Sequence, residues 1–203
     1  MARTWATHEM EEAAHLEGFA VVAGMDEVGR GPLAGPISVG LVILPEGFAE
    51  PVVDSKLLSA KQRAEKAIAI RAAAEWFCVE HVEPDFLDKH GVTASLQEAA
   101  RRILTKVDIR PDLVLLDGKH NFLRDIMSAR TIVKGDMICA SIAAASILAK
   151  EERDELMREY ALQYPEYGFE THVGYGTPRH IAALKKYGVT PIHRSSFLGN
   201  ILS

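Results

Sequence analysis

Short apolar runs alternate with longer amphipathic stretches along the chain. Five of the runs have the length and the β-branched content that favour strands over helices, and they are Gly18–Met25, Pro36–Leu44, Trp76–Val82, Leu113–Leu116 and Thr131–Val133. Four stretches have a helical composition or spacing, over residues 59–74, 93–106, 137–160 and 178–187. Because a short connection joins the first two strands and the later strands alternate with helices, the pattern predicts an α/β domain with a mixed central sheet.

The composition agrees with a globular protein that has a hydrophobic core. With 48% hydrophobic residues, 25% charged residues and only 9 prolines, a disordered or fibrous chain is excluded. The longest charge-free apolar stretch covers residues 137–149, well short of the roughly 20 residues that a membrane-spanning helix needs. The N-terminus has no apolar run, so we expect no signal peptide. Cys78 and Cys139 lie in apolar contexts and are expected to be buried thiols of a cytoplasmic protein.

The charge is distributed unevenly. The chain has a formal net charge of −5, yet residues 171–203 contain four basic residues and no acidic one. A basic C-terminal segment on an acidic body is a candidate surface for a polyanion. The same charges are equally typical of a solvated surface helix, so charge alone leaves both interpretations open.

Acidic residues stand where apolar runs end. Asp26 and Glu27 follow the first predicted strand, Asp117 follows the fourth, and Asp136 precedes the longest predicted helix. Side chains at strand ends often form ligand and catalytic sites in α/β sheets. Several carboxylates together repel one another, and a divalent cation removes that cost. Oxygen ligands alone select a hard ion such as Mg²⁺ or Mn²⁺.

Each of these carboxylates also has a purely structural explanation. Asp136 is well placed to cap the helix that follows it, and Asp117 before Gly118 is typical of a turn. Asp26 and Glu27 are adjacent, so on a regular strand their side chains would face opposite sides of the sheet. One of the two must therefore lie at a bulge or beyond the strand end if both serve one site.

The connection between the first two strands is rich in glycine. Gly29, Gly31 and Gly35 resemble a dinucleotide-binding loop, but their spacing is wrong, Pro32 interrupts them, and a strand follows instead of a helix. A nucleotide-cofactor fold is therefore rejected. A tight β connection remains, in which glycine also allows backbone amides to approach a phosphate or a sugar.

Six segments in this order and spacing resemble bacterial ribonuclease HII. They are residues 24–36, Asp54-Ser55-Lys56, Leu116-Asp117-Gly118, Lys134-Gly135-Asp136, residues 140–150 and residues 172–177. The resemblance implies a ribonuclease H-like α/β fold, a mixed central sheet flanked by helices, with a C-terminal helical extension. We accordingly expect an N-terminal extension over 1–17, a catalytic domain over 18–165 and a C-terminal helical segment over 166–203 packed on it.

The resemblance also implies an activity and a set of site residues. The enzymes of this family hydrolyse the RNA strand of RNA–DNA hybrids, cut 5′ of ribonucleotides embedded in duplex DNA, and leave 5′-phosphate and 3′-hydroxyl ends, as ribonucleotide excision repair requires. The matching catalytic and metal-binding carboxylates, which would hold two Mg²⁺ or Mn²⁺ ions, are Asp26, Glu27, Asp117 and Asp136. The matching substrate-binding residues are Gly29, Arg30 and Gly31, which sense the 2′-hydroxyl, and Tyr175, which packs on the sugar.

Basic residues near the implied substrate path are candidate phosphate contacts. These are Lys56, Lys134, Lys150, Arg179 and Arg194. Many family members carry lysine where this chain has Leu57 and Val173, which we expect to weaken backbone binding without affecting the chemistry. The small residues between Ala140 and Ala149 are explained by close packing of a helix on the sheet. We further expect a monomer, and a possible contact of the tail after Phe197 with a replication clamp.

Three alternatives to this interpretation stay open at the level of sequence. A junction resolvase or a ribonuclease HIII shares the metal chemistry, although the second usually has an additional N-terminal domain, for which the residues before Gly18 leave no room. A hybrid-binding module without activity would not need four carboxylates that repel one another. A phosphatase for small phosphate esters would not need the Gly29–Gly31 loop or Tyr175.

Overall fold

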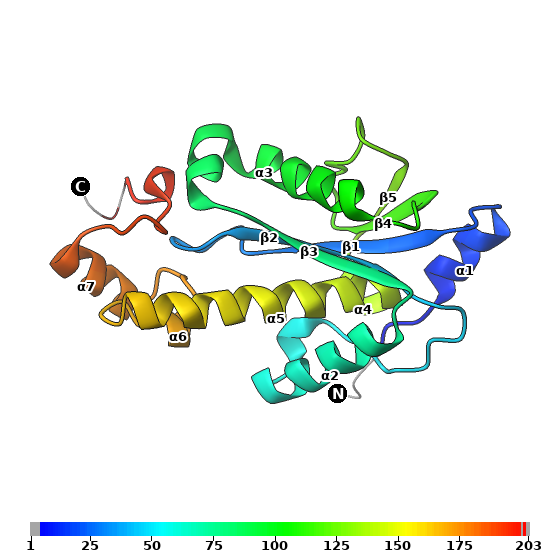
Figure 1. Ribbon diagram of the computed structural model, residues 1–203, viewed down its shortest axis with the longest axis horizontal. Coiled ribbons are helices and arrows are strands. Elements are labelled where there is room, and N and C mark those ends of the chain that lie inside the picture. Colours follow the sequence, from blue (N-terminus) through cyan, green and yellow to red (C-terminus); the bar gives the residue numbers. More distant parts are fainter. Residues whose placement is uncertain (1–4, 200, 202–203) are drawn as a thin grey trace.

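A computed structural model describes residues 5–199 and 201 of the chain. Its centre is a five-stranded sheet in the order β3-β2-β1-β4-β5 (Figure 1). The strands are β1 (Val22–Val28), β2 (Ile37–Ile43), β3 (Trp76–Val82), β4 (Leu113–Asp117) and β5 (Ala129–Ile132). Because β1 pairs antiparallel with β2 and parallel with β4, the predicted mixed sheet is confirmed.

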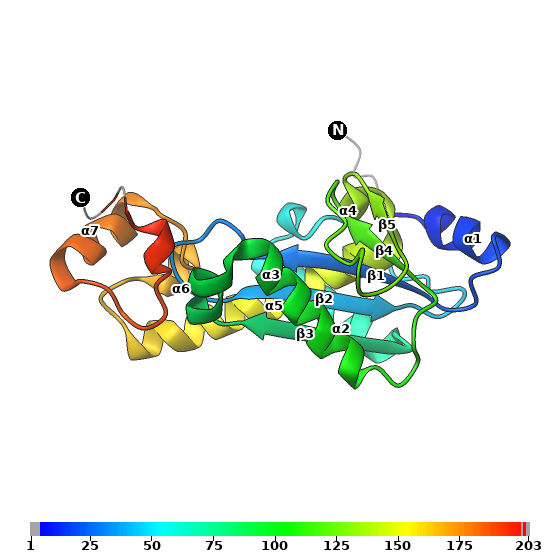
Figure 2. The ribbon, with the colours of Figure 1, turned by 90° about the horizontal axis from the view of Figure 1, so that it is seen from above.

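Helices cover both faces of this sheet. The helices within the described residues are α1 (Glu9–Leu16), α2 (Ala60–Ala73), α3 (Pro84–Lys106), α4 (Gly135–Ile138), α5 (Ala140–Gln163), α6 (Phe169–His172) and α7 (Pro178–Tyr187), with short 3-10 turns η1 (Ser55–Leu57) and η2 (Ser195–Phe197). Helix α3 lies on one face, whereas α5 and α2 lie on the other (Figure 1). Figure 2 shows α6, α7 and η2 gathered at one end of the molecule, where the C-terminal half of α5 extends beyond the strands.

Three helices differ from the sequence-based prediction. Helix α1 was not expected, since it is short and its apolar residues are few. Helix α3 begins at Pro84 rather than residue 93, and its two halves meet at a kink where Gly91 has φ 81° and ψ 172°. The single helix predicted over 137–160 is divided at Cys139 into α4 and α5. Both interruptions break the helical period on which the prediction depended.

Two glycines allow α5 to lie directly against the sheet. A Cβ atom at Gly24 of β1 would collide with the backbone of Ser141, and one at Gly40 of β2 would lie 2.6 Å from the carbonyl oxygen of Ala145. Residues 140–149 of α5 are all buried, and several of them pack with Val42 of β2 and neighbouring residues. The predicted close packing of these small residues is confirmed.

The C-terminal segment has a hydrophobic cluster of its own at the far end of α5. Met157 of α5 packs there with Leu33 of the β1–β2 connection and with Phe169 and Leu184 of the C-terminal helices. Helix α5 therefore joins the sheet to this segment, as the contacts of its two halves show. The domain boundaries at residues 17 and 165 remain predictions.

The side chains of the basic C-terminal segment are less exposed than the charge pattern suggested. His172, His180 and His193 are buried, and Arg194 is fully buried, donating hydrogen bonds to the carbonyl oxygens of Gly35 (2.9 Å) and Arg30 (3.2 Å). The prediction that Arg194 contacts phosphate is therefore wrong, because its guanidinium holds the backbone of the β1–β2 connection. Arg179 remains exposed.

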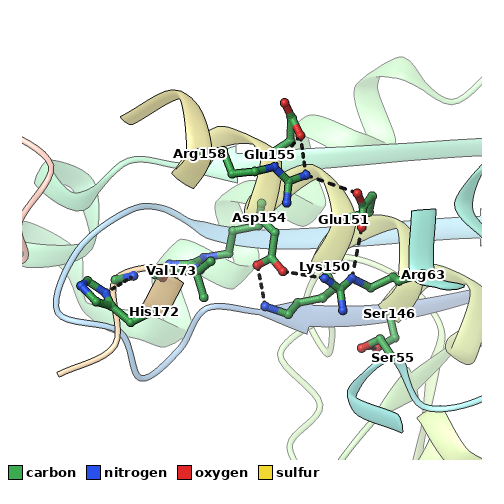
Figure 3. Close-up of polar contacts among 12 residues, drawn as sticks. Ser55, Arg63, Ser146, Lys150, Glu151, Asp154, Glu155, Arg158, His172 and Val173 are labelled. Atoms are coloured by element: carbon green, nitrogen blue, oxygen red, sulfur yellow. Dashed lines mark hydrogen bonds and ion pairs between the residues drawn. The ribbon is translucent and has the colours of Figure 1, made fainter. Parts of the chain in front are cut away.

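Lys150 is also occupied within the protein. It pairs with Asp154 one turn further along α5, and Asp154 in turn accepts a hydrogen bond from Arg63 of α2 at 2.9 Å (Figure 3). Arg63 also reaches Glu151 at 3.1 Å. This network joins α2 to α5, so Lys150 has a structural role in addition to any contact with phosphate.

Both cysteines are free thiols, as expected. Cys139 is buried, whereas Cys78 is only partly so. Across residues 5–199, no helix has both the length and the apolar character needed to cross a membrane.

Candidate active site

Three of the four predicted carboxylates converge at one end of the sheet. Asp26 belongs to β1, Asp117 is the last residue of β4, and Asp136 lies in α4. The parallel register places Met25 opposite Leu116, so the two aspartates that follow lie side by side on neighbouring strands. One carboxylate oxygen from each of the three aspartates lies within 4.8 Å of the others, a set that could hold a metal ion.

The charges in this group destabilise one another. Burial, followed by repulsion from Glu27 and Asp117, raises the pKa of Asp26 well above its ordinary value. Burial also raises the pKa of Asp136, because the attraction of Lys56 offsets only part of the cost. Anions held together in this way gain from a positive charge between them. Since all the donors are oxygens, the group fits a hard divalent cation.

Backbone contacts fix Asp117 and Asp136 relative to each other. The Oδ1 atom of Asp117 accepts a hydrogen bond from the backbone N–H of Gly135 at 2.7 Å. A side chain at position 135 would collide with Ile142, so glycine allows α4 to approach β4 this closely. Asp136 does not cap α5, which begins after Cys139 without a side-chain cap. The structural explanation of Asp136 as a simple N-cap is therefore wrong.

Glu27 is not among the residues whose carboxylate oxygens gather within 4.8 Å of one another. It continues the regular pairing of β1, opposite Val39, so the bulge or strand end that would turn it toward Asp26 is absent from β1. Its Oε1 atom accepts a hydrogen bond from Nη1 of Arg30 at 3.0 Å, and its buried Oε2 atom has no partner. Burial raises the pKa of Glu27, and Asp117 adds repulsion, so its charge still acts on the group. Its role as a metal ligand stays a prediction.

Lys56 supplies a positive charge at the edge of the carboxylate group. Its Nζ atom lies 3.0 Å from Oδ2 of Asp136 and 3.5 Å from Oδ1 of Asp54. Burial acts to lower the pKa of Lys56, but the hydrogen bond and attraction to Asp136 outweigh burial and raise it. Asp54 holds the turn itself, because its side chain accepts from the backbone N–H of Lys56 at 2.9 Å. Lys56 therefore lies directly next to the aspartates in this structure, and its role in binding substrate stays a prediction.

The glycine-rich loop and Tyr175 are the second group of predicted site residues. Gly29 has φ 91°, and a Cβ atom there would collide with the side chain of Arg153. A Cβ atom at Gly31 would lie only 3.9 Å from Cε1 of Tyr175, so the loop and the tyrosine are neighbours. Tyr175 is 46% exposed, which excludes a role as a core residue. The structure thus brings together two elements that are far apart in sequence.

Arg153 of α5 binds these two elements to each other. Its fully buried guanidinium donates to the carbonyl oxygens of Pro36 (2.9 Å), Ala34 (3.1 Å) and Val173 (3.0 Å). The backbone N–H of Leu33 donates to the carbonyl oxygen of Gly174 at 2.8 Å. Sequence reasoning missed Arg153, because nothing in the charged second half of α5 distinguishes a buried arginine from exposed ones.

A pair of buried histidines holds the backbone of Tyr175 through a hydrogen bond. His193 accepts at Nδ1 from the backbone N–H of Thr190 (2.9 Å), so its proton is on Nε2, which lies 3.0 Å from Nε2 of His180. His180 then accepts at Nε2 and donates from Nδ1 to the carbonyl oxygen of Tyr175 at 2.9 Å. This arrangement requires both rings to be neutral, because a protonated ring would place two N–H groups against each other.

Lowering the pH should therefore destabilise the folded protein, because it protonates this pair of histidines. Burial, followed by repulsion from His180, lowers the pKa of His193 from its usual 6.5 to about 4, and burial lowers that of His180. A folded-state pKa below the unfolded one gives stability that is complete above pH 6.5 and is lost as the pH falls toward 4. We expect the free energy of unfolding to fall by about 2 to 3 kcal/mol over that interval, measured by urea denaturation.

Two variants separate the pair from other acid-sensitive groups. His193→Gln cannot be protonated, so its free energy of unfolding should change less between pH 6.5 and 4.5 than that of the wild type. His120→Gln removes an exposed histidine and should keep the wild-type dependence. Equal pH dependence in the wild type and His193→Gln would contradict the assignment.

Comparisons with known proteins agree in one family. The family model for Ribonuclease HII matches residues 23–199. The ribonuclease HII of Endomicrobium trichonymphae is 48% identical over 182 residues, which cover 89% of this chain and 87% of the relative. All four predicted carboxylates, the Gly29–Gly31 loop and Tyr175 lie within the range that the family model matches.

Two solved structures have a similar fold. The ribonuclease H2 from Pyrococcus horikoshii OT3 matches with a TM-score of 0.74 and 27% identity, covering 90% of this chain and 97% of the other. The RNase HII of Archaeoglobus fulgidus, solved in a complex with PCNA, matches with a TM-score of 0.70 and 24% identity over 86% of this chain and 94% of the other. The fold therefore extends over nearly the whole chain.

Proposed function

Since the chain belongs to the ribonuclease HII family and is a ribonuclease H enzyme, we propose that it hydrolyses the RNA strand of RNA–DNA hybrids and cuts 5′ of ribonucleotides embedded in duplex DNA. The observation that carries the proposal is the group of Asp26, Asp117 and Asp136, with one oxygen of each within 4.8 Å of the others. The loop and the exposed tyrosine described above supply the part of the site that would recognise a ribonucleotide.

The donor set supports Mg²⁺ or Mn²⁺ as the cofactor. Asp26, Asp117 and Asp136 would hold the ions, with Glu27 as the fourth candidate. Two ions held there would supply activation of a water molecule and stabilisation of the leaving 3′ oxygen, as a cut with 5′-phosphate and 3′-hydroxyl ends requires. Lys56 already lies against Asp136, where its charge also favours the phosphate of a substrate.

Recognition of the ribonucleotide is assigned to backbone rather than to long side chains. The 2′-hydroxyl distinguishes RNA from DNA and can both donate and accept a hydrogen bond. Backbone groups at Gly29, Arg30 and Gly31 can approach it closely, because two of these residues have no side chain. Tyr175 stands beside Gly31 with an exposed ring that can pack on a neighbouring sugar.

Two further parts of the proposal concern partners. Arg179 and Lys134, both exposed, are candidate contacts for the backbone of the duplex. We also propose that the protein is a monomer and that its C-terminal tail contacts a replication clamp. The PCNA complex of the Archaeoglobus fulgidus relative supports the second part. The tail includes residues 200, 202 and 203, which lie outside the described residues.

A cleavage assay tests the proposal directly. The substrate is an end-labelled DNA duplex with one ribonucleotide, incubated with Mg²⁺, with Mn²⁺ or with a chelator, and an all-DNA duplex is the control. We expect a metal-dependent cut on the 5′ side of the ribonucleotide and an intact control. Binding without a cut in either metal would instead indicate a module without activity. Equal hydrolysis of a small phosphate ester would indicate a phosphatase.

A further inference from the structure

A cavity lies where β1 begins, whereas the carboxylate group lies further along this strand. Its volume is about 760 Å³, within the range of roughly 300 to 1,000 Å³ that is typical of ligand sites. Helix α1, the start of β1 and the end of β2 contribute to its walls. Figure 2 shows α1 at the end of the molecule away from α6 and α7. No residue of this cavity has a role in the site described so far.

The charged lining of the cavity is acidic. Four glutamates line it, and they are Glu11 and Glu12 of α1, Glu46 after β2, and Glu75 before β3. Elsewhere the protein pairs several of its glutamates, as in the ion pairs of Glu50 with Lys66 and of Glu151 with Arg63. Within residues 5–199, no ion pair includes any of the four, and no lysine or arginine is part of the lining. The cavity therefore favours a positively charged ligand.

Glu11 forms part of the inner wall, where one of its oxygens lacks a partner. The residue is only 6% exposed, and its neighbour in the wall, Ser141, is fully buried. Its Oε1 atom accepts a hydrogen bond from the backbone N–H of Ser141 at 2.7 Å. Its Oε2 atom is buried and has no hydrogen-bond partner among the described residues. Because a buried carboxylate oxygen without a partner is costly, an N–H group brought by a ligand would stabilise it.

The spacing of the acidic groups excludes a single metal ion as the ligand. Among the described residues, the aspartates of the carboxylate group are the set of three donors that gather within 4.8 Å. The four glutamates belong to three separate segments and form no such set, so their charges suit a cation that is extended. The rest of the lining includes Leu16, which is 90% exposed, and the apolar side chains of Val22 and Ile43. An extended cation with an aliphatic body matches both parts of the lining.

We propose that this cavity binds an aliphatic polyamine. Its ammonium groups lie beside the glutamates, and one of them donates to the Oε2 atom of Glu11. Its methylene chain packs against Leu16, Val22 and Ile43. The inference does not depend on the proposed function, because none of these residues belongs to the carboxylate group, the glycine-rich loop or the Tyr175 segment.

Isothermal titration of the full chain with spermine tests the proposal. We expect the wild type to bind one spermine molecule per chain. Glu11→Gln should weaken binding about tenfold, because it removes the buried charge but keeps an acceptor for the N–H of Ser141. The double variant Glu46→Gln/Glu75→Gln should also weaken binding about tenfold, since the loss of each exposed charge contact weakens it a few-fold. Thermal unfolding shows whether each variant is folded at the temperature of the titration.

Two control variants should keep the wild-type affinity for spermine. Glu65→Gln removes one negative charge from an exposed position of α2 outside the cavity. It measures how much of the binding is due to the net charge alone. Asp26→Asn removes a charge from the carboxylate group, which is the other acidic cluster that could attract a polyamine.

Each other outcome overturns the proposal. If the wild type does not bind spermine, or if folded Glu11→Gln and Glu46→Gln/Glu75→Gln both bind it as tightly as the wild type, the cavity is not a polyamine site. An equal loss in Glu65→Gln would reduce the effect to net charge. A loss confined to Asp26→Asn would place spermine at the carboxylate group. Tighter binding of tetralysine than of spermine, lost in the same glutamate variants, would make the cavity a surface for a basic peptide instead.

Discussion

We expect Asp26→Asn to lower the rate of cleavage at an embedded ribonucleotide by about 10³-fold or more, while its affinity for the duplex stays within a few-fold of the wild-type affinity. The physical reason is that Asp26 is buried among like charges, where its carboxylate would be a ligand of the metal ion. An amide in its place removes a charged ligand and several kcal/mol of stabilisation of the transition state. We expect the phosphate contacts that bind the duplex to come from basic side chains and backbone groups rather than from Asp26.

Single-turnover cleavage and a binding titration in the presence of chelator measure the two effects separately. Asp85→Asn is the matched control, because the Asp85 side chain is 78% exposed and pairs with Lys89 at 2.6 Å, far from the carboxylate group in sequence. This variant should cleave at the wild-type rate. Because Asp26→Asn also relieves repulsion in the group, its thermal stability should not fall. Near-normal turnover by Asp26→Asn would remove this residue from the active site.

Arg153→Leu should have the second large effect, and it concerns stability. Leucine cannot donate to the carbonyl oxygens of Ala34, Pro36 and Val173, which would be left buried without their partner. Each buried carbonyl that loses its hydrogen bond costs roughly 1 to 3 kcal/mol. We therefore expect the free energy of unfolding to fall by about 3 to 5 kcal/mol, a large part of the total for a domain of this size.

Equilibrium denaturation in urea measures this loss. Arg158→Leu, on the same helix, is the control, since Arg158 is partly exposed and pairs with Glu155 and Glu151. Exposed pairs of this kind contribute about 0 to 1 kcal/mol. If Arg153→Leu remains folded at low temperature, its KM for the ribonucleotide duplex should rise more than its kcat falls. The reason is that Arg153 no longer joins the backbone of the Gly29–Gly31 loop to that of the Tyr175 segment. Equal stability of the two variants would contradict the role assigned to Arg153.

Much of the site could be predicted because carboxylates at strand ends are visible in the sequence. The parallel register of β1 and β4 then brings Asp26 and Asp117 together, as the strand-end pattern indicates. The position of the Glu27 side chain was harder to predict, because it depends on whether β1 is regular through residue 28. The structure shows that the strand is regular there. The burial of the basic C-terminal segment was hard to predict for a similar reason. Arg194 and the three histidines have the composition of a surface, yet the fold buries them and provides backbone partners.

The sequence by itself determined the mixed α/β fold and the positions of the carboxylates, because strand length, helical period and the interruption of apolar runs are local properties. Only the tertiary structure decided which polar side chains are buried and what they hold. Arg153 binds carbonyl groups more than 100 residues away along the chain, and Ser146 meets Ser55 across two elements. Such contacts leave no periodic signal, because they depend on how α5 crosses the sheet rather than on the residues next to them.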